Sequence, residues 1–428
     1  MATTTEPGTG TTISFLNKLL GGTPLTHVSI RFWDGTLWPD NRPRAATVVL
    51  KHPGALREML ASGTAKGLGE AYLRDDFDVE GDMEQSLELA VALENRPAGW
   101  LNSLANFYHF NRLPNAHGGR FDGRELGDLK GRQHTLTRDR QVVSFHYDVS
   151  NDFYQLWLDE RMVYSCAYFE TPADDLDMAQ VAKLRHLCRK LRLQPGQHIL
   201  DIGCGWGGFA IFAARNFGVK VMGVTLASGQ ASLATERAKA AGLTDAVNIE
   251  LRDYREVQRP ENGFDAIVSV GMSEHVGRDH LPEYFKKTWD LLKPGGVFLN
   301  HAIGENLQQD RFRGPSFIDE YVFPDGDIPP IPIVLGAAES GGFEVRDVEN
   351  LREHYALTLR HWVRRLEASH DQAMAFVNEP TYRVWRLYMA GSAHGFDHGA
   401  IALYQALLAK PGPSGNAGLP LTRRDWYE

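Results

Sequence analysis

The sequence predicts an α/β protein whose larger part is a doubly wound, mostly parallel sheet. Three observations support this prediction. Short apolar strands alternate with helical segments after residue 140, a glycine-rich turn follows the first of these strands, and a smaller α+β pattern precedes them. Alternation of this kind is typical of parallel sheets covered by helices on both faces. A chain of 428 residues is long enough for two domains.

Shifts in composition suggest where the domains begin and end. Residues 1–11 are polar, rich in Thr and Gly, and expected to be disordered. Residues 12–112 are expected to form the N-terminal α+β domain, and the charged, Gly-rich stretch 113–137 a linker. Residues 138–410 then form the larger domain, and residues 411–428 a loop-like C-terminal tail.

The N-terminal domain shows strand and helix signals in alternation. Residues 28–40 contain Asp34-Gly35, a dipeptide typical of hairpin turns, and residues 45–51 are rich in β-branched side chains. Residues 52–63 and 83–94 follow with apolar residues at helical spacing.

The larger domain contains a series of short apolar runs, each expected to be a strand of the parallel sheet. They are residues 198–203, 219–226, 247–253, 264–271, 296–303 and 343–351.

Bulk composition excludes several classes of protein. A formal charge of −9 argues against a broadly basic, nucleic-acid-binding surface. Three scattered cysteines are too few for a disulfide framework or a zinc cluster, so no metal is expected and a reducing cytoplasm is the simplest compartment. The N-terminus lacks the basic and apolar regions of a secretory signal, and no apolar run is long enough to span a bilayer.

The glycine-rich turn indicates the ligand. Gly203, Gly205 and Gly208 spell G-x-G-x-x-G, which lets a backbone and a helix N-terminus approach an anionic group. In a dinucleotide site an acidic residue at the end of the following strand binds the ribose hydroxyl groups. Thr225 and Leu226 occupy that position here.

Other residues around the turn fit S-adenosylmethionine (SAM) better. Asp201, just before the glycines, suits a cationic amino group. Arg252-Asp253-Tyr254, at the end of the third strand, suit the edge and face of an adenine. The pattern therefore favours SAM over a dinucleotide. It leaves open a turn that serves only tight helix–sheet packing.

Eight longer motifs then narrow the assignment to a family. They are residues 145–170, 200–210 (LDIGCGWGGFA), 223–230, 269–277 (SVGMSEHVG), 300–304 (NHAIG), 321–332, 354–362 and 382–396. In this order they resemble cyclopropane-fatty-acyl-phospholipid synthases and their mycolic-acid relatives, over about residues 140 to 410 and more loosely in the N-terminal domain. The resemblance implies a class I SAM-methyltransferase fold and a small N-terminal domain that handles lipid.

The resemblance also implies the reaction. SAM methylates the cis double bond of an acyl chain in a phospholipid, and a carbocation forms at the neighbouring carbon. Loss of a proton from the new methyl group closes a cyclopropane. The enzyme has to align the alkene with the methyl donor and exclude water.

The family's functional residues map onto positions in the matching motifs. The resemblance implies that a bound bicarbonate (or carbonate) ion is the base, held by Cys166, Glu274, His301, the backbone of Ile303, and Tyr355. It implies SAM contacts from Tyr164, Ser165, Gly203, Gly205, Thr225, Leu226, Gln230, Asp253, Tyr254 and Arg255, to which the residue pattern adds Asp201.

Two departures from the family pattern leave the product open. Ser273 stands where relatives commonly carry Phe, directly before Glu274, and the segment 389–401 lacks the cysteine and arginines often found there. A methylene- or methyl-branched acyl chain is therefore the near alternative to a cyclopropane, with a reductase as a further partner. More distant alternatives are a methyltransferase for a soluble small molecule and a lipid-binding protein without turnover.

Several surface and partner expectations complete the interpretation. The resemblance implies a homodimer and an enzyme of the cytoplasm held peripherally at the inner face of the membrane, where it meets phospholipid acyl chains. A basic cluster contains residues that either contact anionic head groups or form a solvated helix face: Lys183, Arg185, Arg189, Lys190 and Arg192. Four aromatic residues in the matching motifs either stabilise a cation or line a core or lipid tunnel: Tyr321, Phe323, Trp362 and Trp385.

Overall fold

The computed structural model describes residues 8–20, 25–94, 104–115, 131–147, 149–307 and 317–427. The chain divides into two compact units. Unit 1 contains residues 1–125, 312–322 and 377–394, and unit 2 contains residues 126–311, 323–376 and 395–428. The sequence assigned 312–322 and 377–394 to the larger domain, whereas the described residues of both segments, 317–322 and 377–394, pack with the N-terminal residues.

Unit 1 is built on a four-stranded sheet with the order β2-β1-β3-β4. Its strands are β1 (Val28–Arg31), β2 (Leu37–Trp38), β3 (Ala46–Leu50) and β4 (Phe77–Gly81). The predicted hairpin joins β1 to β2, and its turn is closed by hydrogen bonds between Phe32 and Thr36 and between Gly35 and Phe32. The buried side chains of β3 alternate with partly exposed ones, as expected of a sheet with one covered face.

The helices of unit 1 come from three separate parts of the chain. They are α1 (Thr9–Leu20), α2 (Ala55–Ala61), α3 (Ala65–Leu73), α4 (Met83–Glu94), α5 (Leu104–Asn111), α12 (Phe317–Tyr321) and most of α16 (Glu379–Asp397). The expectation of disorder over residues 1–11 is wrong for residues 9–11, which begin α1 and bury Thr9; residues 1–7 lie outside the described part.

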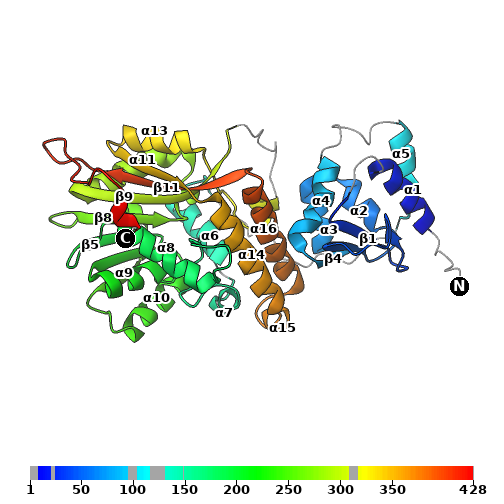
Figure 1. Ribbon diagram of the computed structural model, residues 1–428, viewed down its shortest axis with the longest axis horizontal. Helices are drawn as coiled ribbons and strands as arrows, with labels where there is room; N and C mark the ends of the chain where they lie inside the picture. The colour runs from blue at the N-terminus through cyan, green and yellow to red at the C-terminus, as the bar shows by residue number, and fades with distance from the viewer. Residues whose placement is uncertain are drawn as a thin grey trace. The chain divides into compact units, whose positions relative to one another are not determined.

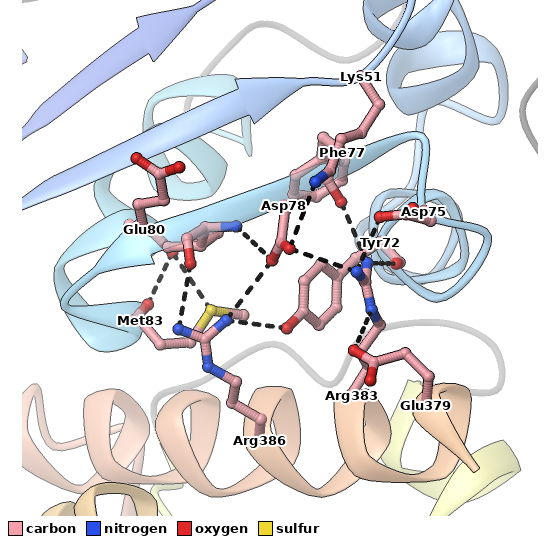
Figure 2. A network of polar contacts seen from close by, with 12 residues as sticks. Lys51, Tyr72, Asp75, Phe77, Asp78, Glu80, Met83, Glu379, Arg383 and Arg386 are labelled. Atoms are coloured by element: carbon pink, nitrogen blue, oxygen red, sulfur yellow. Dashed lines mark hydrogen bonds and ion pairs between the residues drawn. The ribbon is translucent and has the colours of Figure 1, made fainter. Parts of the chain in front are cut away.

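Two arginines of α16 attach it to the N-terminal part of unit 1 (Figure 2). Arg383 donates to the carbonyl oxygen of Tyr72 (2.9 Å) and to the carboxylates of Asp75 (2.7 Å) and Asp78 (3.3 Å). Arg386 donates to the hydroxyl of Tyr72 (3.1 Å) and to the carbonyl oxygen of Val79. Both arginines are buried. A segment more than 300 positions along the chain therefore completes the N-terminal unit.

Unit 2 contains a seven-stranded sheet with the order β10-β11-β9-β8-β5-β6-β7 (Figure 1). Its strands are β5 (His198–Ile202), β6 (Lys220–Thr225), β7 (Val247–Leu251), β8 (Phe264–Val270), β9 (Leu292–Glu305), β10 (Glu344–Asn350) and β11 (Ile401–Ala409). The five strands from β9 to β7 are parallel, and β11 pairs antiparallel with both β9 and β10. The mostly parallel doubly wound sheet is confirmed.

Helices cover both faces of this sheet (Figure 1). Residues of α8, α9 and α10 share one hydrophobic cluster with the strands, and residues of α11 and α13 share the other. The helices of unit 2 are α6 (Leu136–Tyr147), α7 (Asn151–Gln155), α8 (Leu176–Lys190), α9 (Gly208–Phe217), α10 (Ser228–Ala240), α11 (Leu281–Leu291), α13 (Ile331–Ser340), α14 (Arg352–Ala368) and α15 (His370–Ala373), with 3₁₀ turns η2 (Tyr254–Glu256), η3 (Ser273–His275), η4 (Arg278–His280) and η5 (Arg424–Trp426).

The ends of the predicted linker and tail are partly ordered. Helix α6 starts at Leu136, inside the expected linker, and residues 116–130 lie outside the described part. In the expected tail, Trp426 is buried and its ring lies 5.2 Å from the ammonium of Lys190. Among the helices in the described part of the chain, none has the length and apolar character needed to cross a membrane.

Candidate active site

A cavity opens at the carboxyl ends of the parallel strands of unit 2, the edge where ligands bind in doubly wound folds. It is lined by the residues that directly follow β5, β6, β7 and β8, and it holds about 1260 Å³ of non-protein space, its open mouth included. All of the residues predicted to contact SAM line it. They are Tyr164, Ser165, Asp201, Gly203, Gly205, Thr225, Leu226, Gln230, Asp253, Tyr254 and Arg255.

Backbone conformation explains the glycines of the turn between β5 and α9. Gly203 and Gly205 have φ angles of 77° and 52°, which L-residues with side chains rarely adopt. The amide of Gly203 donates to the carbonyl oxygen of Val224 (2.9 Å), which fixes the turn against β6. A Cβ at Gly208 would lie 2.9 Å from Val163, so this third glycine permits close packing at the start of α9.

Thr225 and Gln230 occupy the place of the missing acidic residue. The Thr225 hydroxyl donates to Oε1 of Gln230 (2.9 Å), and both side chains are buried. Because this bond uses the amide oxygen of Gln230, its Nε2 group remains as a donor suited to hydroxyl groups of a ribose.

An arginine held by two carboxylates borders the cavity beyond β7. Arg255 donates to Asp253 and to Asp139, each at 2.7 Å, and lies 5.5 Å from the centre of the Tyr254 ring. The hydrogen bond to Asp253 is the main cause that raises the pKa of Arg255, so the guanidinium stays charged. Asp139 was not predicted as part of this site. It lies on α6, far before the glycine-rich turn in the sequence, and no motif in the sequence links it to the cofactor.

A second buried group of side chains lies beside this cavity, on β9, β11 and η3. His301 is paired with Val270, the last residue of β8, and Oε1 of Glu274 accepts a hydrogen bond from the amide of Ile303 (2.9 Å). Nδ1 of His301 lies 3.2 Å from the side-chain amide of Gln405 on β11. With that amide as donor, Nε2 of neutral His301 carries the proton.

Cys166 and Tyr355 both contact the main chain of Leu351, which connects them to the same group of residues. The Cys166 thiol lies 3.2 Å from the carbonyl oxygen of Ala167 and 3.8 Å from that of Leu351, while the amide of Tyr355 donates to Leu351. The amide of Leu351 in turn donates to Leu403, which is paired with Ile303. None of the residues predicted to hold bicarbonate lines the cavity, so they form a separate group next to it.

Burial controls the ionisation of this second group. Burial raises the pKa of Glu274 to about 7 and raises the pKa of the Cys166 thiol, and it lowers the pKa of His301 well below its ordinary value. Near neutral pH the thiol and the imidazole are therefore uncharged. Within the described part of the chain, Oε2 of Glu274 and Nε2 of His301 are buried without a hydrogen-bond partner. One acceptor and one donor therefore remain for a small polar ion or molecule.

These atoms fit a protonated oxyanion in part. The imidazole N–H suits an anionic oxygen, and the Glu274 carboxylate suits the hydroxyl of a bicarbonate. The main-chain amide of Ile303, however, already donates to Glu274, and the Cys166 thiol already faces main-chain carbonyl oxygens. These two groups are therefore engaged within the protein.

Trp362 connects the two groups. Its ring centroid lies 5.2 Å from that of Tyr164, which lines the cavity, and 6.1 Å from that of Tyr355, which belongs to the second group. Trp362 is completely buried, and Trp157 packs 5.5 Å from both Trp362 and Tyr164. An aromatic wall therefore separates the cavity from bulk water on this side.

The other aromatic candidates divide between the two units. Phe323 belongs to unit 2 and stacks on His146 with ring centroids 3.9 Å apart. Tyr321 and Trp385 belong to unit 1. The prediction that these rings face a cation or a lipid tunnel stays a prediction.

The basic cluster on α8 and just beyond it is not a uniformly solvated face. Lys183 and Lys190 are buried, at 1% and 0% exposure. Lys190 lies 2.5 Å from Glu349 and 3.5 Å from Asp347, and Lys183 lines the cavity. The idea that these two lysines contact lipid head groups is therefore wrong, because their ammonium groups are turned into the protein.

Comparison with known proteins agrees with this geometry. Residues 134–406 match the family model described as mycolic acid cyclopropane synthetase. The chain is 41% identical over 402 residues to a probable fatty acid methyltransferase of Pseudomonas putida, covering 93% of this chain and 95% of the relative. It is 34% identical over 371 residues to the cyclopropane-fatty-acyl-phospholipid synthase of Escherichia coli K12, covering 86% and 89%.

A solved structure resembles a large part of this chain. It is the mycolic acid cyclopropane synthase CmaA1 in complex with S-adenosylhomocysteine (SAH) and CTAB, at 35% identity and a TM-score of 0.60. The similarity covers 63% of this chain and 97% of that one. The predicted cofactor residues thus gather in a chain similar to one that has been crystallised with the demethylated form of SAM.

Proposed function

The chain belongs to the mycolic acid cyclopropane synthetase family of SAM-dependent methyltransferases, and from this membership we propose that its substrate is the cis double bond of an unsaturated acyl chain in a membrane phospholipid. The proposed product is a cyclopropane fatty acyl chain. The observation that carries the proposal is a pair of buried atoms next to the cofactor cavity, Nε2 of His301 and Oε2 of Glu274, which have no hydrogen-bond partner among the residues that the structure describes.

An alkene has no proton to lose before it attacks the methyl group, so the enzyme needs no base to activate it. The site has instead to align the alkene with the methyl donor and to exclude water. SAM supplies an electrophilic methyl group when bound. The π electrons would form the new bond to that methyl group as its bond to the sulfur of SAM breaks and SAH leaves, and positive charge would develop on the adjacent chain carbon. The buried rings of Trp157 and Trp362, packed against Tyr164 of the cavity wall, exclude water that would otherwise capture this cation.

Ring closure requires removal of one proton from the transferred methyl group. A bicarbonate ion would supply a base small enough to reach it. His301 would donate its Nε2 proton to the anion, and Glu274 would accept the hydroxyl hydrogen and orient the ion. The Gln405 amide keeps the imidazole in the required tautomer, and burial keeps it neutral.

A methylene- or methyl-branched product is the second candidate. Ser273 is buried at the start of η3, directly before Glu274. Its small hydroxymethyl group gives the carboxylate a different environment from the one that the phenyl ring of a Phe would give. The name of the Pseudomonas relative, a probable fatty acid methyltransferase, is compatible with either product. A branched product would call for a partner reductase.

The remaining parts of the proposal follow from the family resemblance. We propose that the enzyme acts as a homodimer at the inner surface of the cell membrane and takes acyl chains from phospholipids there. The lipid substrate, and not the cofactor, requires this location.

Isotope labelling of membrane lipids tests the proposed function. A host without its own cyclopropanating activity expresses the protein and receives oleate and methionine with a trideuterated methyl group. Fatty acids that gain one carbon and keep two deuterium atoms are expected, because ring closure removes one deuteron. An exocyclic methylene also keeps two. The cyclopropane is therefore established by the upfield ring methine protons in the NMR spectrum, which come from the acyl chain and carry no label.

Two glutamate variants provide the matched control. Glu274→Gln should abolish most of the labelled product, whereas Glu261→Gln, at an exposed position, should not change it. Labelled alkene without ring protons would favour the branched product. Absence of labelled lipid from cells that contain folded, SAH-binding protein would contradict the lipid substrate and favour a soluble acceptor.

A further inference from the structure

Two buried groups of opposite charge line the cofactor cavity without forming an ion pair with each other. Asp201, on β5, is 2% exposed, and Lys183, on α8, is 1% exposed. In the described part of the chain, Oδ2 of Asp201 is buried and has no hydrogen-bond partner. A buried charge without a close partner is costly, so a partner supplied by a ligand would stabilise each of them.

The hydrogen bond of Lys183 determines how the neighbouring serine is oriented. Nζ of Lys183 donates to Oγ of Ser165 at 2.9 Å. An ammonium group has only donors, so the serine oxygen is the acceptor in this bond. The hydroxyl hydrogen of Ser165 is then available to another acceptor, and Ser165 also lines the cavity.

Helix α8 holds the serine in place from a second position one turn earlier. The side-chain amide of Gln180 donates to the carbonyl oxygen of Ser165 (2.9 Å) and to that of Val163 (3.3 Å). Gln180 is itself completely buried. Hydrogen bonds from the Gln180 side chain to two main-chain carbonyl oxygens therefore fix the segment from Val163 to Ser165 to α8. The hydroxyl group of Ser165 is not needed for this attachment.

We propose that Lys183 and Ser165 together bind the carboxylate of the methionyl group of SAM, while Asp201 binds its ammonium group. The cavity thus matches a zwitterion with one buried cation and one buried anion. The inference rests on the cofactor and not on the acyl substrate, and it assigns to Lys183 a binding role that no motif in the sequence indicated.

Binding of two related ligands tests the assignment. SAH carries the amino-acid group, whereas 5′-methylthioadenosine has the same nucleoside and thioether sulfur without it. Lys183→Met should weaken SAH binding about tenfold to hundredfold, the range expected for loss of a charged hydrogen bond, and leave 5′-methylthioadenosine binding unchanged. Lys220→Met, at an exposed position on β6, should change neither. Equal losses for both ligands, or no loss for SAH, would overturn the proposal.

The pH dependence of binding gives a second test on the wild-type protein. Burial lowers the pKa of Lys183 to about 8, despite the opposing charge of Asp201. The titratable groups that act on Lys183 are Asp159, Cys166, Asp201 and His301. Burial raises the pKa of Asp201 to about 7, so its carboxylate gains charge, and favours the SAH ammonium, as the pH rises toward 8. Above pH 8, SAH affinity should fall relative to that for 5′-methylthioadenosine as Lys183 loses its proton.

Lys183→Arg separates this lysine from the other titrating groups. Its guanidinium stays charged, so the pH step near 8 should disappear from the affinity ratio, whereas the amino group of SAH titrates equally in both proteins. A wild-type ratio with the same pH profile as that of Lys183→Arg would refute the role of Lys183. Since both tests measure SAH binding, their failure is distinguishable from failure of the lipid-labelling experiment.

Discussion

Replacement of Glu274 by Gln should change how stability depends on pH. Burial raises the pKa of Glu274 from its ordinary value of 4.5 to about 7 in the folded chain. Between these two values the folded state binds more protons than the unfolded state, so the free energy of unfolding falls as the pH rises. Since one pKa unit corresponds to about 1.4 kcal/mol, the carboxylate costs the wild type about 3 kcal/mol above pH 7.

The glutamine variant lacks this cost. Its amide oxygen can still accept the hydrogen bond that Ile303 donates to Oε1 at 2.9 Å, and its buried NH₂ group lowers stability by an amount that does not depend on pH. The difference in unfolding free energy between Glu274→Gln and the wild type should therefore shift by about 3 kcal/mol in favour of the variant from pH 4.5 to pH 8.

Denaturant unfolding of both proteins at several pH values measures this difference. Other buried groups, including Asp201 and Lys183, titrate in both proteins and cancel in the subtraction. Glu261→Gln, at an exposed position, should show no such shift. A pH-independent difference between Glu274→Gln and the wild type would mean that the carboxylate is solvated and would refute the burial argument.

Three further changes have defined outcomes. Arg383→Leu leaves the buried carbonyl oxygen of Tyr72 and the carboxylate of Asp78 without this donor, so denaturant unfolding of unit 1 should show a loss of about 2–3 kcal/mol; an unchanged midpoint would contradict a structural role. Gly205→Ala has room for a Cβ but forces alanine to a φ of 52°, so calorimetry should show about 1–2 kcal/mol lower stability. Ser273→Phe should raise the ratio of cyclopropane to branched product in labelled lipids, and an unchanged ratio would remove Ser273 as the cause of product choice.

The sequence predicted the parallel strands and the cofactor cavity because both depend on local signals. Apolar runs mark β5 to β9, and the left-handed conformations at Gly203 and Gly205 require glycine. Strand β11 was missed, because the apolar run at 401–409 lacks the alternation of a half-covered strand and follows directly on a long helix. Its position is set by pairing with β9 over about a hundred residues and with β10 over about sixty, which no local pattern reports.

Long-range contacts also explain the errors in charge and domain assignment. Lys183 and Lys190 look like members of a solvated basic cluster, but α8 turns both toward the protein, where Ser165 and Glu349 accept their hydrogen bonds. The same holds for α16, whose arginines find Asp75 and Asp78 in unit 1. Composition gives the number of charges on a helix, whereas their partners depend on the tertiary fold.

The division of the chain into two units affects when each unit can fold during synthesis on the ribosome. Unit 1 needs residues 377–394, and the sheet of unit 2 needs β11 between β9 and β10. Residues 28–81 therefore emerge with their strands complete but without the arginines of α16, which follow about 300 residues later. At about 5–20 residues per second this delay lasts on the order of tens of seconds. Both units are thus completed only after residues 377–409 have been synthesised, and a chain released before α16 has emerged leaves both units incomplete.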